Sequence, residues 1–451
     1  MTTESKPSTA GGADIAKKTP GSSVILDRSD PQFLAQAHEV YADLRAQGAV
    51  SKTRVYATLQ DEADQAKAMQ GQRRINETFF VSHYDEVVAA LMSDKLSCNP
   101  LAGIPPEHLA KMPPIPEEFR PMLQTLPLID PPDHTRLRRL VQPSFGPRAL
   151  EALRPRIQRL AEDMLDQVEL EAAKRGEASP DRRIDLVKAF AYPFPVAVIS
   201  EMLGIPEEDR QTIENLSEVR IDNRDPAAVA KTRTQLLGFA NYLKALFERK
   251  RREPGEDMIS QMIQAQEDGD KLSESELLSM VFILYLGGHI TTVNLIGNGV
   301  VALLSHPEQA AKLRNNLDLV ENVVEETLRY WGPVDFTGSP RMTKESVELG
   351  GTNIPKGASV TVGFGSANRD PKQFTNPDTF DITRADAHRH LAFGRGIHLC
   401  LGAPLARMEG QIAFETLFRR FPEMRLALPV ESLRWNGAMG MRGYAEVPIL
   451  F

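Results

Sequence analysis

Cysteine is scarce in this 451-residue sequence, which has only Cys98 and Cys400. Two cysteines cannot build a disulfide framework, and they are consistent with a reducing cytoplasm. Positive charge is not in excess either, because 53 Lys and Arg residues face 61 Asp and Glu residues, for a formal charge of -8. This balance argues against nucleic acid as the main partner. Composition therefore favours a cytoplasmic protein over a disulfide-rich or nucleic-acid-binding one.

The first 28 residues lack an apolar run, so we expect a mobile polar tail over 1–28, with no signal peptide or membrane anchor. The rest has no Gly/Ser-rich or charged linker, which predicts one domain over 29–451. The stretch Val281–Leu304 is long enough to span a bilayer. Because it contains polar residues such as Asn294 and Asn298, we interpret it as a buried helix.

Helical periodicity dominates the chain. It predicts helices over Pro31–Gly48, His83–Ser93, His134–Gln142, Pro147–Gly176, Leu186–Leu203, Ala228–Lys250, Ser273–Leu304, Pro307–Asn315, Leu317–Tyr330 and Ala403–Phe421. Short β-type runs occur at Phe79–Ser82, Val347–Leu349, Ser359–Gly363 and Val447–Phe451. The segment Leu96–Ile129 is rich in proline and has no clear period, which is typical of a functional or disordered loop.

The most informative segment is Phe393-Gly394-Arg395-Gly396-Ile397-His398-Leu399-Cys400-Leu401-Gly402. Its glycines allow tight backbone turns and close approach to a flat ligand. The helix predicted from Ala403 places Cys400 at a helix N-terminus, where N–H groups and the helix dipole favour an anion. A cysteine in this setting suits a thiolate held for a metal.

The pattern F-G-x-G-x-H-x-C-x-G resembles the haem-binding loop of the cytochrome P450 haem-thiolate monooxygenases. The resemblance implies that Cys400 is the axial ligand of a haem b iron. It implies that Phe393, Gly394 and Gly402 shape the cofactor pocket. It also implies a mainly α (α+β) fold, a triangular α-rich domain with small β-sheets and a long central helix over the haem.

That long helix is predicted to begin at the capping box Ser273-Glu274-Ser275-Glu276. Its segment Gly287-Gly288-His289-Ile290-Thr291-Thr292 resembles the oxygen-binding groove of the family. The resemblance makes Gly288, His289, Ile290 and Thr291 candidate catalytic residues. Thr291 matches the threonine that helps deliver protons during oxygen activation.

Ile290 departs from the family pattern, which usually has Asp or Glu at this position for the proton relay. Three explanations remain open. His289 or ordered water replaces the acid, since histidine titrates in the required range. The substrate supplies a polar group. Alternatively, the enzyme uses peroxide or runs a coupling or desaturation reaction that needs less proton delivery. We favour a monooxygenase with an altered relay.

Several basic residues are candidates for binding the haem propionates. His134 and Arg138 are four apart on a predicted helix, so they share a face that suits a carboxylate. Arg341 and His398 match two further donors of the family. A cofactor with two carboxylates in an apolar pocket requires such donors.

The E-x-x-R segment from Glu326 to Arg329 resembles a structural motif of the family, and Arg384 matches its usual third partner. We expect a buried ion network that supports the haem loop, with no catalytic role.

The resemblance implies a small apolar organic substrate, free or bound to a carrier protein. The expected pocket residues are Leu284, Tyr285, Val334, Phe336, Thr337 and Met439. With no nucleotide-binding or flavin unit in the chain, we expect a separate electron donor, either a ferredoxin with its reductase or a flavodoxin. Arg136, Arg139, Arg407, Arg419 and Arg420 are candidates for a basic docking face, with a plain solvated surface as the alternative for each of them. We expect a monomer.

The predicted function is oxygen insertion into an organic molecule, by analogy in a natural-product pathway. The alternatives are a peroxide-using or C–C/C–O coupling haem-thiolate enzyme, and a non-catalytic haem-binding protein that lost the relay at Ile290.

Overall fold

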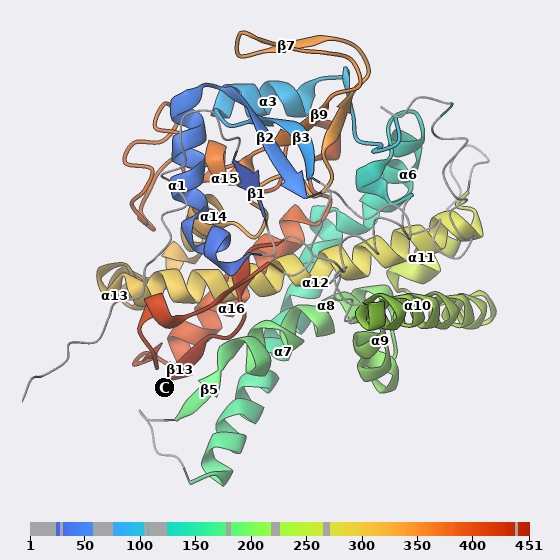
Figure 1. Cartoon of the computed structure of the whole chain (residues 1–451). Coiled ribbons are helices and arrows are strands. Elements are labelled where there is room, and N and C mark those ends of the chain that lie inside the picture. The colour runs from blue at the N-terminus through green and yellow to red at the C-terminus, as the bar shows by residue number, and fades with distance from the viewer. Residues whose placement is uncertain are drawn as a thin grey trace, which may run out of the picture.

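The computed structural model describes residues 24–27, 30–56, 75–102, 107, 124–176, 182–217, 226–264, 271–437 and 441–451. Helices make up most of the molecule, and a β-rich corner lies beside α1 and α3 (Figure 1). The main helices of this part of the chain are α1 (Pro31–Gln47), α3 (Tyr84–Met92), α6 (Asp133–Val141), α7 (Pro147–Lys174), α8 (Pro193–Leu203), α9 (Arg210–Ser217), α10 (Pro226–Arg252), α11 (Met258–Gln264), α12 (Glu274–Ser305), α13 (Pro307–Asn315), α14 (Val320–Trp331) and α16 (Ala403–Arg420). The mainly α architecture with small sheets is as predicted.

Helix α12 runs across the middle of the molecule (Figure 1). It begins at the predicted capping box, in which the Ser273 N–H donates to Glu276 Oε2 over 2.8 Å and the Glu276 N–H donates to Ser273 Oγ over 3.3 Å. Its 32 residues give a rod of roughly 48 Å. By length and composition it is the one helix of the described residues that meets the test for a membrane span. It packs against α8, α14 and α16 in the main core, so the interpretation as a buried helix is confirmed.

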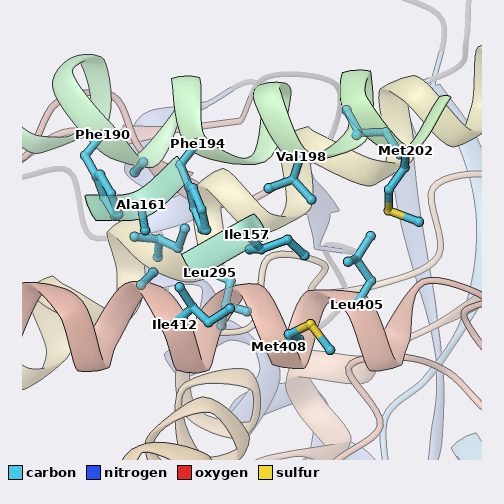
Figure 2. Packing of buried hydrophobic residues seen from close by; sticks show 14 of the residues in the cluster. Ile157, Ala161, Phe190, Phe194, Val198, Met202, Leu295, Leu405, Met408 and Ile412 are labelled. Carbon is cyan, nitrogen blue, oxygen red and sulfur yellow. The ribbon is translucent and has the colours of Figure 1, made fainter. Parts of the chain in front are cut away.

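The core joins α12 to the helix that follows the cysteine loop. Side chains from four segments interlock in Figure 2. They are Ile157 and Ala161 of α7, Phe190, Phe194, Val198 and Met202 in and before α8, Leu295 of α12, and Leu405, Met408 and Ile412 of α16. Because interiors are close-packed, this contact fixes α16, and with it Cys400, relative to α12.

The largest sheet has six strands in the order β1-β2-β3-β9-β6-β4. These strands are β1 (Ile25–Leu26), β2 (Val50–Tyr56), β3 (Ile75–Val81), β4 (Leu96–Ser97), β6 (Arg341–Thr343) and β9 (Ser359–Val362). Pairing of β4 with β6 sets Ser97 opposite Met342, which brings Arg341 to the neighbourhood of Cys98. The smaller sheets are formed by β5 (Arg183–Asp185), β10 (Arg425–Leu426) and β13 (Pro448–Leu450), by β11 (Trp435–Asn436) and β12 (Gly443–Tyr444), and by β7 (Val347–Leu349) and β8 (Thr352–Ile354).

The predicted helix over Leu186–Leu203 is divided in the structure. A π-helical segment, Val187–Ala191, comes first, and α8 starts only at Pro193. Proline has no N–H to continue a helical ladder, so Pro193 begins a new helix instead of extending the old one. Most of the proline-rich segment Leu96–Ile129 lies outside the described residues.

Candidate active site

The cysteine loop is shaped by glycines with left-handed backbone. Gly394 has φ 70° and Gly396 has φ 77°, values that favour glycine over any residue with a Cβ. At Gly396 there is also no room, since an added Cβ would lie 3.0 Å from the Leu91 carbonyl oxygen. The turn is closed by the Cys400 N–H, which donates to the Phe393 carbonyl over 2.9 Å. The loop therefore presents Cys400 directly before α16.

The pKa of the Cys400 thiol is subject to two opposing influences. Burial raises the pKa of the thiol, while the backbone N–H of Gly402, the charge of Arg138, the N–H of Ala403 and the charge of Arg407 lower it. Although protein surrounds it, Cys400 keeps an exposed side chain because it borders a hollow. Donors and cations in this arrangement suit a thiolate that binds a cation such as iron.

A cluster of polar donors without acceptors lies next to this loop. His134 is 1% exposed, and neither of its ring nitrogens has a hydrogen-bond partner among the described residues. Its ring centroid is 4.1 Å from that of His398. Arg341 is also buried, and its Nε has no partner in the same part of the chain. Buried donors that lack acceptors cost about 1–3 kcal/mol each, so they indicate a ligand with acceptor oxygens.

The electrostatics of this cluster are those of an anion site. The pKa of His398 is lowered to about 4, first by burial and then by the charges of His134, Arg341 and Arg138, while Asp130 opposes the shift. Burial likewise lowers the pKa of His134, which has Arg138 as a charged neighbour. Neutral imidazoles that donate one N–H, together with two guanidinium groups, match the carboxylates of haem.

Cys98, Asp130 and His398 place possible metal-ligand atoms within 4.8 Å of one another. Asp130 already accepts the Cys98 N–H over 2.8 Å and a hydrogen bond from the Ser97 hydroxyl. Burial raises the pKa of the Cys98 thiol, and the opposing effect comes from Arg341. Because cationic groups lie next to this cluster, we assign it to the carboxylate-binding site and not to a metal.

One face of α12 is partly exposed along the middle of the helix, whereas most of the other residues there are buried. Thr291 donates from its hydroxyl to the Gly287 carbonyl, 2.9 Å away. Among the described residues, and apart from the backbone of α12 itself, no atom lies within 4 Å of the position that a Cβ on Gly287 would take. A hydroxyl that donates in this way still has lone pairs with which to accept a proton or hydrogen bond. At helical spacing, the partly or fully exposed residues of this face are Ile283, Leu284, Gly287, Ile290, Thr291 and Asn294.

Two predicted catalytic residues lie elsewhere. A Cβ at Gly288 would lie 2.9 Å from the side chain of Ile199 in α8, so the open position belongs to Gly287. His289 is 2% exposed, and its Nδ1 is 2.6 Å from the Tyr285 carbonyl oxygen. Burial lowers the pKa of His289 to about 4, so the ring is neutral near pH 7. His289 therefore does not replace an acid on the open face, and Ile290 at the edge of that face has no titratable group.

The predicted pocket residues divide into two groups. Leu284 lies on the open face of α12, and Val334 and Thr337 are partly buried. Tyr285 is fully buried against Phe239, with ring centroids 5.5 Å apart, and so lies off the open face of α12. Phe336 is 4% exposed and contacts Tyr41 and Phe80, so it too is packed in the interior. Met439 lies outside the described residues.

The ion network predicted to support the loop is present. Arg329 donates to both carboxylate oxygens of Glu326 over 2.7 and 2.8 Å, and Arg384 Nε lies 3.2 Å from Glu326 Oε2. Arg329 also donates to the carbonyl of Asn368 over 3.0 Å. The Asn368 side chain in turn accepts the Leu391 N–H over 2.7 Å, two residues before Phe393. The network therefore reaches the start of the cysteine loop.

The hollow beside Cys400 has a volume of about 830 Å³. Four arginines line it, Arg138, Arg389, Arg395 and Arg407, and Asp85 is the one acidic residue of the described lining. No described lining residue belongs to α12, so this hollow is not the space next to Thr291. Four arginines predicted for docking are held by carboxylates, in the pairs Arg136–Glu276, Arg407–Glu325, Arg419–Glu162 and Arg420–Glu169. Of these four, only Arg407 belongs to the described lining of the hollow. Sequence patterns did not single out Arg389 and Arg395, because the loops that carry them have no regular period.

A cysteine at a helix N-terminus, a glycine turn before it and a buried cradle for carboxylates define a haem-thiolate site. Comparison with known proteins agrees. The family model "Cytochrome P450" matches residues 117–426. Cytochrome P450 107B1 of Saccharopolyspora erythraea is 46% identical over 320 residues, which cover 71% of this chain and 75% of the relative.

Two further relatives connect sequence and structure. The polyketide biosynthesis cytochrome P450 PksS of Bacillus subtilis is 38% identical over 371 residues, 82% of this chain and 88% of the relative. Its solved structure matches with a TM-score of 0.80 over 94% of this chain and 98% of that chain. Myxobacterial CYP267B1 in complex with myristic acid matches with a TM-score of 0.81 at 38% identity, over 94% of this chain and 98% of that chain. The chain therefore belongs to the cytochrome P450 family and is a haem-thiolate monooxygenase.

Proposed function

We propose that this monooxygenase binds haem b through the Cys400 thiolate and inserts one oxygen atom from O2 into an apolar organic molecule. The observation that carries the proposal is the cysteine loop with its neighbouring donor cradle. In that cradle His134, Arg138, Arg341 and His398 would bind the two propionates. When bound, the haem supplies the oxygen chemistry, and the protein supplies binding, orientation and electrostatics.

On the substrate side, we propose that the open face of α12 forms one wall, with Leu284 as an apolar contact. Thr291 would hold and pass a proton at its Oγ, since its hydroxyl both donates and accepts. Gly287 would leave room for the reacting molecule to approach the helix backbone. Val334 and Thr337 are the remaining described candidates for pocket contacts.

A second candidate function follows from Ile290. No described residue of the open face of α12 is an acid or a histidine, so proton delivery there depends on Thr291, water or the substrate. This favours either an altered relay or a reaction that uses peroxide. To separate them, turnover of wild type and Ile290→Asp would be measured with O2 plus an electron donor and with hydrogen peroxide. Under the altered relay, O2-driven turnover predominates in wild type and Ile290→Asp raises product per electron. Turnover with peroxide alone, unchanged in Ile290→Asp, would favour the peroxide enzyme.

For the substrate, we propose an apolar polyketide-like or acyl molecule. PksS is named for polyketide biosynthesis, and CYP267B1 was solved with myristic acid. The test is a spin-state titration of the ferric protein with macrolides, fatty acids, terpenes and acyl chains on a carrier protein. A saturable shift with macrolides or acyl chains supports the proposal. A shift only with another class would overturn it, and a shift only with the carrier-bound form would identify a tethered substrate.

The electron donor is proposed to dock on the hollow beside Cys400. Arg138, Arg389 and Arg395 give this concave surface a positive charge, which suits an acidic ferredoxin or flavodoxin. We also propose a monomer in the cytoplasm with a single domain over residues 29–451.

A further inference from the structure

A buried carboxylate outside the predicted motifs lies one residue before the E-x-x-R pair. Glu325 receives two hydrogen bonds from Arg407, Nε to Oε1 over 2.7 Å and Nη2 to Oε2 over 3.0 Å. His390 Nε2 lies 3.3 Å from Glu325 Oε2. The side chains of Glu325 and His390 are 13% and 1% exposed, whereas that of Arg407 is 35% exposed. The three residues come from α14, the segment just before the cysteine loop and α16, so the fold alone brings them together.

The protonation states of this group follow from its contacts. Burial would raise the pKa of Glu325, but His390 and Arg407 together lower it to about 2, so it is ionised near neutral pH. Burial lowers the pKa of His390, and Glu325 only partly offsets this. The His390 Nδ1 accepts the Ala392 N–H over 3.1 Å, which places the ring proton on Nε2, facing Glu325. Near neutral pH the group therefore has one positive and one negative charge.

The group encloses the first residue of the cysteine loop. The Arg407 guanidinium carbon lies 4.7 Å from the centroid of the Phe393 ring, and the His390 ring centroid lies 5.7 Å from it. The backbone carbonyl of Phe393 in turn accepts a hydrogen bond from the Cys400 N–H over 2.9 Å. Arg407 and Cys400 also line the same hollow, so the Arg407 charge lies on the side of the loop where the sulfur is exposed. A change in this charge balance changes the field at the thiolate.

We propose that Glu325 is a positioning residue that holds Arg407 over Phe393 and cancels its charge, so that the Glu325–Arg407 pair sets the reduction potential of the thiolate-bound iron. This inference rests on the proposed haem-thiolate site. Reduction adds one electron, so a positive charge left without its partner raises the potential and a negative one lowers it. Charge and hydrogen bonding around an axial ligand are recognised means by which a protein tunes such a potential.

The test is the midpoint potential of the haem-loaded protein, measured by spectroelectrochemistry for wild type, Glu325→Gln, Arg407→Gln and the double variant. Glu325→Gln keeps the size and the acceptor oxygen but removes the charge. It is expected to favour the reduced form by a factor on the order of ten, which is about 59 mV for a one-electron couple. Arg407→Gln is expected to shift the potential in the opposite direction. The double variant, neutral like the wild-type pair, should return to within about twofold of wild type in the reduction equilibrium.

Glu415→Gln is the matched control, because Glu415 pairs with Arg419 on the exposed far end of the same helix, at 3.0 Å. Its potential should equal that of wild type. The proposal would be overturned if Glu325→Gln and Arg407→Gln shifted the potential in the same direction. It would also be overturned if neither variant shifted it, as expected for Glu415→Gln. If Glu325→Gln does not bind haem, the partly exposed Arg407→Gln decides: a lower potential supports the pair, and an unchanged one refutes it. The ferrous–CO spectrum is recorded for each sample, since loss of thiolate ligation in wild type would refute the proposed function and not the role of Glu325.

Discussion

Replacement of Glu326 by glutamine is predicted to destabilise the folded protein strongly. The Glu326 carboxylate binds Arg329, whose side chain is fully buried, and Arg384, whose side chain is 9% exposed. It also accepts the Asp381 N–H over 2.9 Å. In Glu326→Gln, Arg329 still donates to the backbone carbonyls of Asn368, Pro377 and Thr379. The two guanidinium groups nevertheless lose their counter-charge in the interior. Removal of one partner from a buried pair costs about 3–5 kcal/mol, so we expect a loss of at least ~3 kcal/mol.

The assay is urea unfolding of the haem-loaded protein, followed in parallel by far-UV circular dichroism and by the haem absorbance. Because Arg329 and Asn368 connect this network to Leu391, the haem signal of Glu326→Gln should be lost at a lower urea concentration than the helical signal. Glu345→Gln is the matched control, since Glu345 forms an exposed pair with Lys95 at 2.8 Å. Exposed pairs contribute little, so this variant should unfold like wild type. A Glu326→Gln protein that is as stable as Glu345→Gln would refute the reasoning.

Three further predictions concern the site. Thr291→Ala is expected to raise the amount of hydrogen peroxide released per NADH consumed several-fold, measured with a reconstituted electron donor. An unchanged ratio would show that the Thr291 hydroxyl does not take part in proton delivery. His289 has a pKa of about 4 when folded against an ordinary 6.5, so it contributes stability above pH 6.5 that is lost as the pH falls toward 4, about 3 kcal/mol in all. Unfolding of His289→Gln at a series of pH values should therefore show a flatter decline over that window, and a decline equal to that of wild type would contradict the assignment. Arg395→Glu should slow reduction by an acidic ferredoxin at low salt and have less effect at high salt, in stopped-flow traces; a salt-independent effect would argue against docking at the hollow.

The sequence predicts most of the helices because their signals are local. The capping box at Ser273, the proline at position 147 and the apolar period of α16 each lie within a few residues of the element that they specify. Strand β2 was missed, since Val50–Tyr56 alternates with charged residues and is defined by its pairing with β3, which lies 25 residues further along. The π-helical segment before α8 was missed for a similar reason, because a helical period does not reveal a change of helix type.

The candidate site was predictable where residue spacing alone carries the chemistry. Cys400 and the glycine turn belong to one short motif, and the structure places His134 and His398, which the family resemblance proposed as propionate donors, with ring centroids 4.1 Å apart. The sequence could not predict which of two adjacent glycines lies on the open face of α12. Each position along a helix turns by 100°, so Gly287 is open while Gly288 faces Ile199 of α8. The pair Glu325–Arg407 is invisible in sequence because its members are 82 positions apart.

The central claim is that Cys400 binds the haem iron as a thiolate. The most direct test is the ferrous–CO spectrum of wild type, Cys400→Ala and Cys98→Ser, each with its haem content determined. Wild type and Cys98→Ser should show the absorbance maximum that is characteristic of thiolate ligation, and Cys400→Ala should lose it. A thiolate spectrum that persists in Cys400→Ala, or that disappears in Cys98→Ser while haem is still bound, would contradict the account.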